Sequence, residues 1–404
     1  MRKIDLSNFQ VATSETARDI NCRILLNLVR KHQPISRADL TRCSGLQRST
    51  VSVLTEKLLA EQWLKEGALG QLPRGRRPTY LHLNGDRGGI IGINIQPLVT
   101  DMALANLDGR FLAQESLPTP ATPADFVKEV AQRVRGWMKS YPDLAYEGIG
   151  VSLPGRVDLK SQRFVFAPNL MWHLEDLKPR LEQATGLPVD MENAANACAL
   201  SEFWFGTHAE GVVNLVAVTV SEGIGVGLIL NGQLVRGSSG LAGEFGHIAL
   251  NENGPKCRCG NQGCWEVYAS NSAALRHYNE VMLPARGGKA ESGASRSLAE
   301  FDDLLSVAEH GDKEAVATLE RMGHYLGRGI AMLVTGLAPE VIVVVGEVTQ
   351  AWDRVLPIIT EVVKQHCLTH STTRIIASDP ARLPRLRGIV ALVLQKHFGA
   401  PAIA

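Results

Sequence analysis

The chain of 404 residues lacks most of the features that mark secreted, membrane or strongly charged proteins. Only 7 residues are cysteine, 5% are aromatic and the net charge is +1. The odd number of cysteines and the lack of an apolar leader at the amino terminus favour a reducing compartment, the cytoplasm. The most apolar run, 341–345, has the length of one buried strand, and no membrane span is indicated. The length suggests two or three domains.

The charge, although near zero in total, is distributed unevenly. Residues 1–83 contain 14 Lys+Arg and 7 Asp+Glu, a balance of +7, and the remainder contains 28 and 34, a balance of −6. A small basic module joined to a larger acidic body suggests that the module faces a polyanion.

The basic module has the pattern of a helix-turn-helix. Apolar side chains recur at helical spacing over 18–32, Ser36 and Asp39 form a capping pair for a short second helix, and Gly45 marks a turn. In 47–60 the apolar side chains share one face and leave Gln, Arg and Ser on the other. Such a polar face is typical of a recognition helix in a major groove.

The next segment, 70–83, reads as a hairpin whose tip is rich in arginine. Such a wing can place arginines along phosphates or in a narrow minor groove. We therefore predict a winged helix-turn-helix DNA-binding domain over 1–83. The predicted DNA contacts are Arg37, Gln47, Arg48, Ser49, Thr50, Ser52, Arg74, Arg76 and Arg77. The alternative is a three-helix bundle that mediates protein contacts beside a solvated basic loop.

From residue 88 onward strands alternate with helices, which indicates an α/β body. The main predicted elements are strands at 89–96, 99–109, 111–115, 148–153 and 341–346 and a helix at 123–141. We divide the body into a first lobe at 84–200 and a second lobe at 201–404. The final helix, about 385–398, has two candidate neighbours, the first lobe and the N-terminal module.

One short stretch contains a complete set of metal ligands. His247 is followed by Cys257, Cys259 and Cys264 in a glycine-rich knuckle. Three thiolates and one imidazole make the closed tetrahedral set of a structural zinc site, with no position left for water. We predict one structural zinc ion per chain. The alternative, scattered buried thiols and a satisfied histidine, requires three of only seven cysteines to fall within eight residues by chance.

The motif Glu-x-Gly-His, followed by Cys-x-Cys-Gly-x-x-Gly-Cys-x-Glu, resembles the signature of the ROK family of repressors and sugar kinases. The resemblance covers nearly the whole chain. It implies two βββαβα lobes around a cleft, the sugar-kinase/Hsp70/actin-like fold, whereas periodicity alone supports only two α/β lobes. The winged helix is similar to the one that ROK repressors carry and ROK kinases lack, so the resemblance is to the repressor branch, as in the N-acetylglucosamine and xylose repressors.

Three features that the resemblance assigns to a ROK kinase are altered. In the first phosphate loop Asn94 replaces the acid, and Pro97 removes an amide donor. The general base is replaced by Ala194, whose methyl group cannot accept a proton, and losing such a base costs about 10²–10⁴-fold in rate. In the second phosphate loop Glu222 places a carboxylate where phosphate oxygens should sit. We predict that the protein is not an enzyme and has no catalytic residues.

The sugar side of the cleft is nearly intact by the same resemblance. The implied sugar contacts are Asn169, Asn193, Glu244, His247 and Glu266. Carboxylates and amides suit a polyol because they form directional hydrogen bonds with hydroxyl groups. His247 is expected to bind zinc through one nitrogen and to orient the sugar through the other. The alternative is that Glu244 and Glu266 only support the metal-bound histidine or lie at the surface.

These features together predict a sugar-responsive, DNA-binding transcriptional regulator, a repressor of carbohydrate uptake or catabolism genes. Its partners are operator DNA and a sugar or sugar phosphate effector. A homodimer or a dimer of dimers is expected, because palindromic operators match two-fold proteins. Ligand closure of the cleft would then change the placement of two DNA-binding domains. A regulator controlled by a partner protein and an active sugar kinase with an accessory domain are the alternatives.

Overall fold

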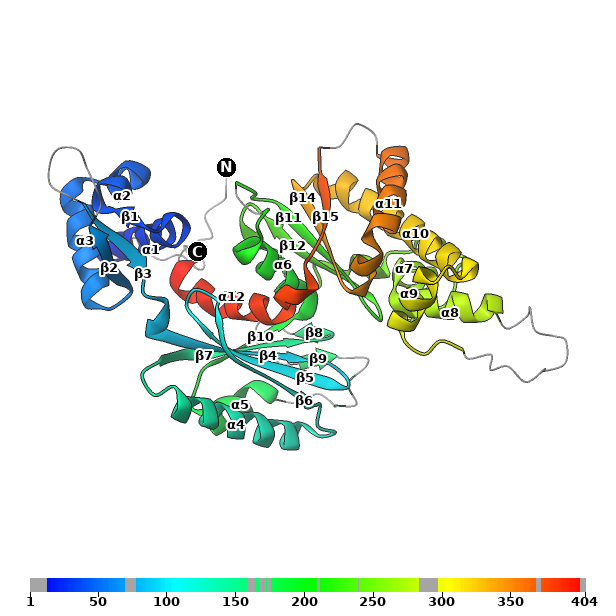
Figure 1. Ribbon diagram of the computed structural model, residues 1–404, viewed down its shortest axis with the longest axis horizontal. Helices are drawn as coiled ribbons and strands as arrows, with labels where there is room; N and C mark the ends of the chain where they lie inside the picture. The colour runs from blue at the N-terminus through cyan, green and yellow to red at the C-terminus, as the bar shows by residue number, and fades with distance from the viewer. Residues whose placement is uncertain are drawn as a thin grey trace.

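The structure is a computed structural model that describes residues 13–69, 78–157, 164–166, 170, 172, 176–208, 211–238, 240–282, 297–367 and 372–399. A small N-terminal module lies at one end, two mixed sheets form the middle, and a group of helices lies at the other end (Figure 1). None of the described helices combines the length and the apolar character that a membrane crossing requires.

The N-terminal module contains three helices and a three-stranded antiparallel sheet in the order β1-β3-β2. The elements are α1 (Ser14–His32), β1 (Ile35–Ser36), α2 (Arg37–Ser44), α3 (Arg48–Ala60), β2 (Leu64–Leu69) and β3 (Thr79–Leu83). The predicted capping box of Ser36 and Asp39 is present, and Gly45 ends α2 with φ +71°. The hairpin begins earlier than predicted, because its first strand starts at Leu64. The predicted tip at 70–77 lies outside the described residues.

The first sheet of the body has the order β10-β7-β4-β5-β6. Its strands are β4 (Gly88–Ile95), β5 (Val99–Asn106), β6 (Phe111–Pro118), β7 (Ala145–Leu153) and β10 (Val189–Asn193). Helices α4 (Pro123–Ser140) and α5 (Leu177–Thr185) cover one face through apolar side chains that include Phe126, Val130 and Leu181. A short pair, β8 (Arg156–Val157) and β9 (Phe164–Phe166), adjoins this sheet.

The second sheet repeats this topology in the order β15-β14-β11-β12-β13. Its strands are β11 (Leu215–Val220), β12 (Ile224–Leu230), β13 (Gln233–Leu234), β14 (Val341–Val345) and β15 (Arg374–Ala377). The helices of the far end are α7 (Glu266–Ala269), α8 (Asn271–Met282), α9 (Phe301–Glu309), α10 (Lys313–Leu337) and α11 (Trp352–His366). Each sheet thus begins with three consecutive antiparallel strands and continues through parallel crossovers. This is the two-lobed α/β arrangement that the resemblance implies.

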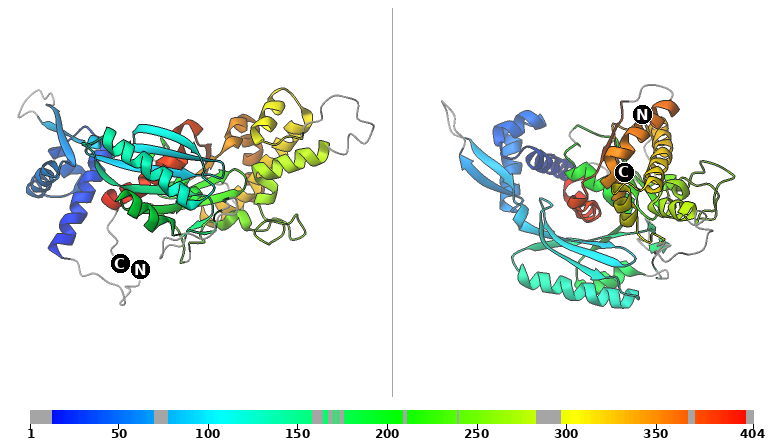
Figure 2. Two further views of the ribbon diagram at one scale, coloured as in Figure 1. Left: turned by 90° about the horizontal axis from the view of Figure 1, so that it is seen from below. Right: turned by 45° about the vertical axis from the view of Figure 1, so that its right-hand side comes forward.

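Two helices lie between the sheets and cross from one half of the chain to the other (Figures 1 and 2). Helix α6 (Ala194–Phe205) follows the first sheet in sequence but packs against β11 and β12 of the second. Helix α12 (Pro384–Phe398) follows the second sheet but packs against β4 and β7 of the first, and along α6. The close approach requires glycine: a Cβ at Gly388 would lie 1.7 Å from the carbonyl oxygen of Ala197. The predicted lobe boundary at residue 200 falls within α6, and the division stays a prediction.

Candidate functional site

Four potential metal ligands converge from two short segments. His247 ends the turn Glu244–His247, and Cys257, Cys259 and Cys264 follow in the loop before α7. Their ligand atoms all lie within 4.8 Å of one another, and two of the pairs, Cys259 Sγ with Cys264 Sγ and Cys257 Sγ with His247 Nδ1, are each 3.7 Å apart. A tetrahedral ion with metal–sulfur bonds of about 2.3 Å holds two sulfurs about 3.8 Å apart. The set can therefore hold a metal ion.

Two carboxylates flank the histidine of this cluster. Glu266 Oε1 lies 3.6 Å from His247 Nδ1 and accepts a hydrogen bond from Cys257 Sγ at 3.0 Å, whereas Glu244 Oε2 lies 3.7 Å from His247 Nε2. Burial raises the pKa of the Cys257 and Cys264 thiols, and the carboxylate of Glu266 raises both further. Thiolates in this surrounding therefore require a nearby cation, which a bound metal ion supplies.

The knuckle is fixed to the second lobe by Trp265, which the sequence analysis did not single out. Its ring is fully buried, and its Nε1 donates a hydrogen bond to the carbonyl oxygen of Tyr325 at 2.9 Å. A Cβ at Gly329 of α10 would lie 1.9 Å from this ring. The loop itself turns at Gly263, with φ +64°, where a Cβ would lie 1.7 Å from the carbonyl oxygen of Asn251. The signal in the sequence was an aromatic residue directly after the last cysteine.

The other predicted sugar contacts lie at the start of α6 or outside the described residues. Asn193 caps α6, accepting from the backbone N–H of Ala195 at 2.7 Å and donating to the carbonyl oxygen of Gly155. Asn169 lies outside the described residues. The turn after β11 and the first residues of β12 lie close to the start of α6 and to Glu266. A Cβ at Gly225 would lie 3.0 Å from the Ala195 Cβ, and a Cβ at Gly223 would lie 2.6 Å from Glu266 Oε2.

An ion pair that the sequence analysis missed joins the two lobes beside this site. Glu192 is 3% exposed, and its Oε2 accepts from Arg236 Nε at 2.7 Å. Its Oε1 accepts from the backbone N–H of Asn193 and from Asn196 Nδ2. Arg236 belongs to the segment that follows β13. The carbonyl oxygen of Arg236 accepts a hydrogen bond from the backbone N–H of Ala242. The ion pair thus connects the start of α6 to the chain that leads into Glu244.

The loop that the resemblance matches to a phosphate loop is closed by side chains. Gln96 Nε2 donates to Asp101 Oδ2 at 3.1 Å, and its Oε1 accepts from Arg385 Nη1 of α12 at 2.8 Å. Asn94 is 4% exposed, and its Oδ1 is buried without a hydrogen-bond partner in the described part of the chain. Ala194 is the first residue of α6, and Glu222 lies exposed at the turn after β11.

The polar face of α3 is open to solvent. The side chains of Gln47, Arg48, Ser49 and Ser52 are exposed, together with Val53, whereas Thr50 is half-buried. Arg37 is used within the module: its guanidinium pairs with Glu56 Oε1 at 2.8 Å and with Glu66 Oε1 at 3.1 Å. Arg74, Arg76 and Arg77 lie outside the described residues.

The N-terminal module rests on the C-terminal end of α12. Asn27 Nδ2 donates to the carbonyl oxygen of Phe398 at 2.6 Å, and Arg23 Nη1 donates to that of Gly399 at 2.9 Å. The Trp63 ring lies 4.8 Å from the His397 ring between centroids. The Arg30 guanidinium lies 4.4 Å from the Trp204 ring centroid, and burial lowers the pKa of Arg30.

A charged cluster continues this junction into the first sheet. Glu147 Oε1 of β7 accepts a hydrogen bond from Arg87 Nη1 at 2.9 Å, and Glu147 Oε2 lies 3.0 Å from His397 Nε2. The hydrogen bond from His397, followed by the charges of His397 and Arg87, lowers the pKa of Glu147. Arg87 also lies over the Trp63 ring, 4.0 Å from its centroid. The N-terminal module, α12 and the first sheet therefore share one packed and charged junction.

Comparisons with known proteins give one consistent result. The sequence model of the ROK family matches residues 90–396. The xylose repressor of Bacillus subtilis (strain 168) is 33% identical over 349 residues, 86% of this chain and 87% of the repressor. A solved ROK family transcriptional regulator, described as a homologue of the Escherichia coli MLC protein, superposes with a TM-score of 0.81 at 25% identity, over 95% of this chain and 98% of that one.

A kinase of the same family covers less of the chain. The structure of a ROK family glucokinase from Streptomyces griseus, in complex with glucose and AMPPNP, superposes with a TM-score of 0.64 at 30% identity. It covers 76% of this chain and 99% of its own length. The repressors thus match nearly the full length of the chain, whereas the glucokinase leaves about a quarter of it unmatched.

Proposed function

The chain belongs to the ROK family, and from this membership we propose that it is a sugar-responsive transcriptional repressor that binds operator DNA and does not phosphorylate its sugar. The observation that carries the proposal is a combination of two features. The N-terminal module has an exposed polar helix face, and the body has altered residues at the positions that phosphate transfer requires. A transcriptional regulator of the family matches 95% of this chain, and the match therefore includes both parts. As a regulator of genes for carbohydrate uptake or catabolism, it would act in the cytoplasm.

The N-terminal module supports DNA binding as a winged helix-turn-helix. Helix α2, the turn at Gly45 and helix α3 have the order and lengths of that motif, and β2 and β3 form the base of a wing. Gln47, Arg48, Ser49 and Ser52 are the side chains we assign to the major groove, with Val53 available for a thymine methyl group. Arg37 acts by its ion pairs to orient α3 against the wing.

The metal ion that suits the cluster is zinc. Three sulfurs and one imidazole nitrogen are the ligands that zinc prefers, and the closed set leaves no coordination position for catalysis. We assign it a structural role: it holds His247 in place and, through Trp265, ties the knuckle to α10. His247 Nε2, which faces Glu244, is then free to take part in binding the effector.

The effector is a sugar bound through Asn193, Glu244, His247 and Glu266, with Asn169 as a further contact by resemblance. We add Glu192 and Arg236 as positioning residues, because their ion pair holds the start of α6 against the segment that leads to Glu244. Phosphate transfer is not supported. Ala194 offers no base, and Gln96 is bonded to Asp101 and Arg385 where a kinase needs free amides.

Helix α12 is the element that we propose connects sugar binding to DNA binding. It packs along α6, whose first residues border the sugar site, and its C-terminal end carries the N-terminal module. A change in the angle between the lobes that moves α12 relative to β4 and β7 therefore moves the module. In a homodimer, such a movement would alter the spacing of two recognition helices.

The proposal is tested by measuring affinity for the DNA upstream of the gene itself, with and without a panel of monosaccharides and their 6-phosphates. We expect a specific complex whose affinity changes at least about fivefold with one sugar. Arg48→Ala should weaken the complex about tenfold or more, whereas Lys128→Ala, which removes the same charge from the exposed face of α4, should not. A specific complex that no sugar affects would instead favour a regulator controlled by a partner protein.

A further inference from the structure

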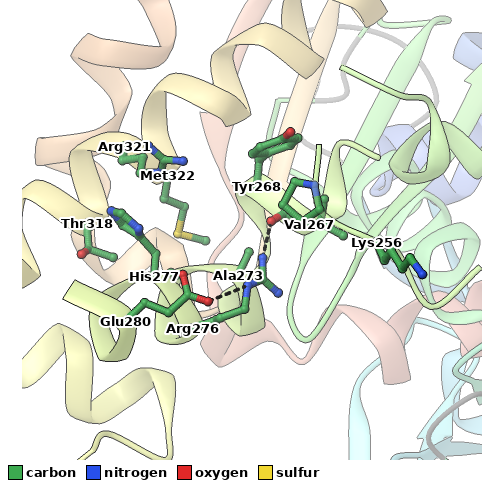
Figure 3. A pocket seen from close by; sticks show the side chains of 12 residues that line it. Lys256, Val267, Tyr268, Ala273, Arg276, His277, Glu280, Thr318, Arg321 and Met322 are labelled. Carbon is green, nitrogen blue, oxygen red and sulfur yellow. Dashed lines mark hydrogen bonds and ion pairs between the residues drawn. The ribbon is translucent and has the colours of Figure 1, made fainter. Parts of the chain in front are cut away.

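A second concave site lies behind the metal knuckle, between α8 and α10 (Figure 3). The cavity has a volume of about 270 Å³. Its floor is made of the buried side chains of Ala273, Ala274 and Met322, with Thr318 beside them. Pockets of this size, with an apolar floor and polar groups at the edge, suit a small molecule.

The charge around this cavity is strongly positive. Lys256, Arg276 and Arg321 line it, and among the described residues Glu280 is the single acid that does. The Arg276 Nε and Glu280 Oε1 atoms are 3.9 Å apart and both side chains are largely exposed, so this ion pair is weak and leaves the positive charge mostly uncompensated. Burial lowers the pKa of His277 in the wall, and the charge of Arg321 lowers it further.

Arg276 and Arg321 line the cavity from α8 and α10, and Lys256 lines it from the loop before α7. Arg276 is oriented by a hydrogen bond from its Nη2 to the carbonyl oxygen of Val267 at 2.6 Å. Arg321 is placed from the opposite helix, with its guanidinium 5.2 Å from the Tyr325 ring centroid. Cations that line one cavity from facing elements suit an anion with several oxygens.

We propose that this cavity binds a small phosphate-bearing metabolite, as a second effector site separate from the sugar cleft. Three cations against one acid leave about two positive charges, which match a phosphate monoester of about −1.5 to −2 at pH 7. The apolar floor then receives the carbon skeleton of the ligand. A neutral sugar would leave the excess positive charge of the cavity uncompensated.

The cavity shares no residue with the proposed sugar contacts, but it uses the same loop. Lys256 precedes the metal ligand Cys257, and Val267 follows Glu266 directly in sequence. A ligand held by Lys256 and Arg321 would therefore act on the loop that contains Cys257. This gives a phosphorylated metabolite a route to modify sugar binding.

The test is calorimetric titration of the full-length protein with glucose 6-phosphate, inorganic phosphate and glucose. We expect saturable binding of at least one phosphate-bearing probe that persists in Glu244→Gln, the variant of the sugar cleft. Absence of binding by both phosphate-bearing probes, or loss of their binding in Glu244→Gln, would overturn the proposal.

Variants of the cavity itself give the second part of the test. Arg321→Gln should weaken binding of the phosphate-bearing probe about tenfold or more, because it removes a charged donor. Lys313→Gln removes the same charge from the start of α10, about 12 Å away along the helix, and should change affinity less than about twofold. Glu280→Gln should tighten binding. Equal affinities for the Arg321 and Lys313 variants would refute the assignment, whatever the outcome for DNA binding.

Discussion

The residues around the knuckle and those at the start of α6 and in the β4–β5 turn differ in what they keep of the features that the resemblance assigns to a ROK kinase. On the knuckle side, Glu244 Oε2 lies 3.7 Å from His247 Nε2 and Glu266 Oε1 lies 3.6 Å from His247 Nδ1. On the transfer side, Gln96 is hydrogen-bonded to Asp101 in the β4–β5 turn, and Ala194 begins α6 at the position that the resemblance assigns to the base of a kinase. The difference teaches that the requirements of binding and of chemistry are separable. A cleft that recognises hydroxyl groups needs its carboxylates and its metal, whereas only phosphate transfer needs the base and the free amides.

The largest effect is expected from removing a metal ligand on the preserved side. Cys264→Ser should lose the bound zinc and lower the melting temperature by about 10 °C or more, because the closed site holds the knuckle against α10. Elemental analysis and calorimetric melting check this. Cys43→Ser, at an exposed cysteine on α2, is the control and should retain both metal and stability. Unchanged metal content in Cys264→Ser would remove zinc from the account.

The next largest effect is expected from replacing a carboxylate at the proposed sugar site. Glu266→Gln should weaken sugar binding by about tenfold or more, because a charged acceptor of hydroxyl groups is lost beside His247. Titration calorimetry measures the affinity, with metal content determined on the same sample. Glu252→Gln, an exposed acid of the same loop, should leave the affinity unchanged. If both variants bind sugar like the parent, the preserved side is not the sugar site.

A smaller effect is expected at the junction between α12 and the N-terminal module, which we propose connects sugar binding to DNA binding. Trp63→Ala removes the ring between Arg87 and His397 and should reduce the sugar-dependent change in DNA affinity to less than about twofold. Sugar binding itself should persist, which separate titrations determine. Trp352→Ala in α11 is the matched control for loss of an indole ring. Full coupling in the Trp63 variant would place the connection elsewhere.

The smallest effect concerns pH at the same junction. The folded-state pKa of Glu147 is lowered below its ordinary 4.5, so its ionised form stabilises the protein above about pH 4.5, and this contribution is lost as pH falls through the lowered pKa. Glu147→Gln should therefore cost about 1 kcal/mol at pH 7 and progressively less below pH 4.5. Thermal melts over this range check it, with Glu309→Gln, an exposed acid of α9, as the control. A pH-independent difference between Glu147→Gln and the parent would contradict this.

Local signals in the sequence sufficed for much of the fold and for a cluster of side chains that could hold a metal ion. Ser36 with Asp39, the turn at Gly45 and the spacing of the three cysteines each act over a few residues, and each predicted structure is present. The first strand of the hairpin was misplaced because Leu64–Leu69 has no strict alternation and includes a glycine. Short-range patterns specify short-range structure.

Features that depend on distant parts of the chain were not predicted. Glu192 and Arg236 are 44 residues apart and meet because β13 of one lobe returns beside α6 of the other. The sequence does not decide between two candidate neighbours for the final helix. The helix contacts both: its apolar face packs on β4 and β7, and its C-terminal end contacts α1. Arginine in a basic module suggested DNA contact for Arg37, but two carboxylates from α3 and β2 hold its guanidinium.

The most direct test of the account compares sugar binding with sugar turnover in one sample. The purified zinc-loaded protein is titrated with a panel of monosaccharides, and the sugar that binds is then incubated with Mg-ATP and assayed for sugar phosphate and ADP. We expect saturable binding with no product, because Ala194 offers no base and the β4–β5 turn is closed by Gln96. Formation of sugar phosphate at a rate proportional to the protein would contradict it and show that the transfer side of the cleft still works.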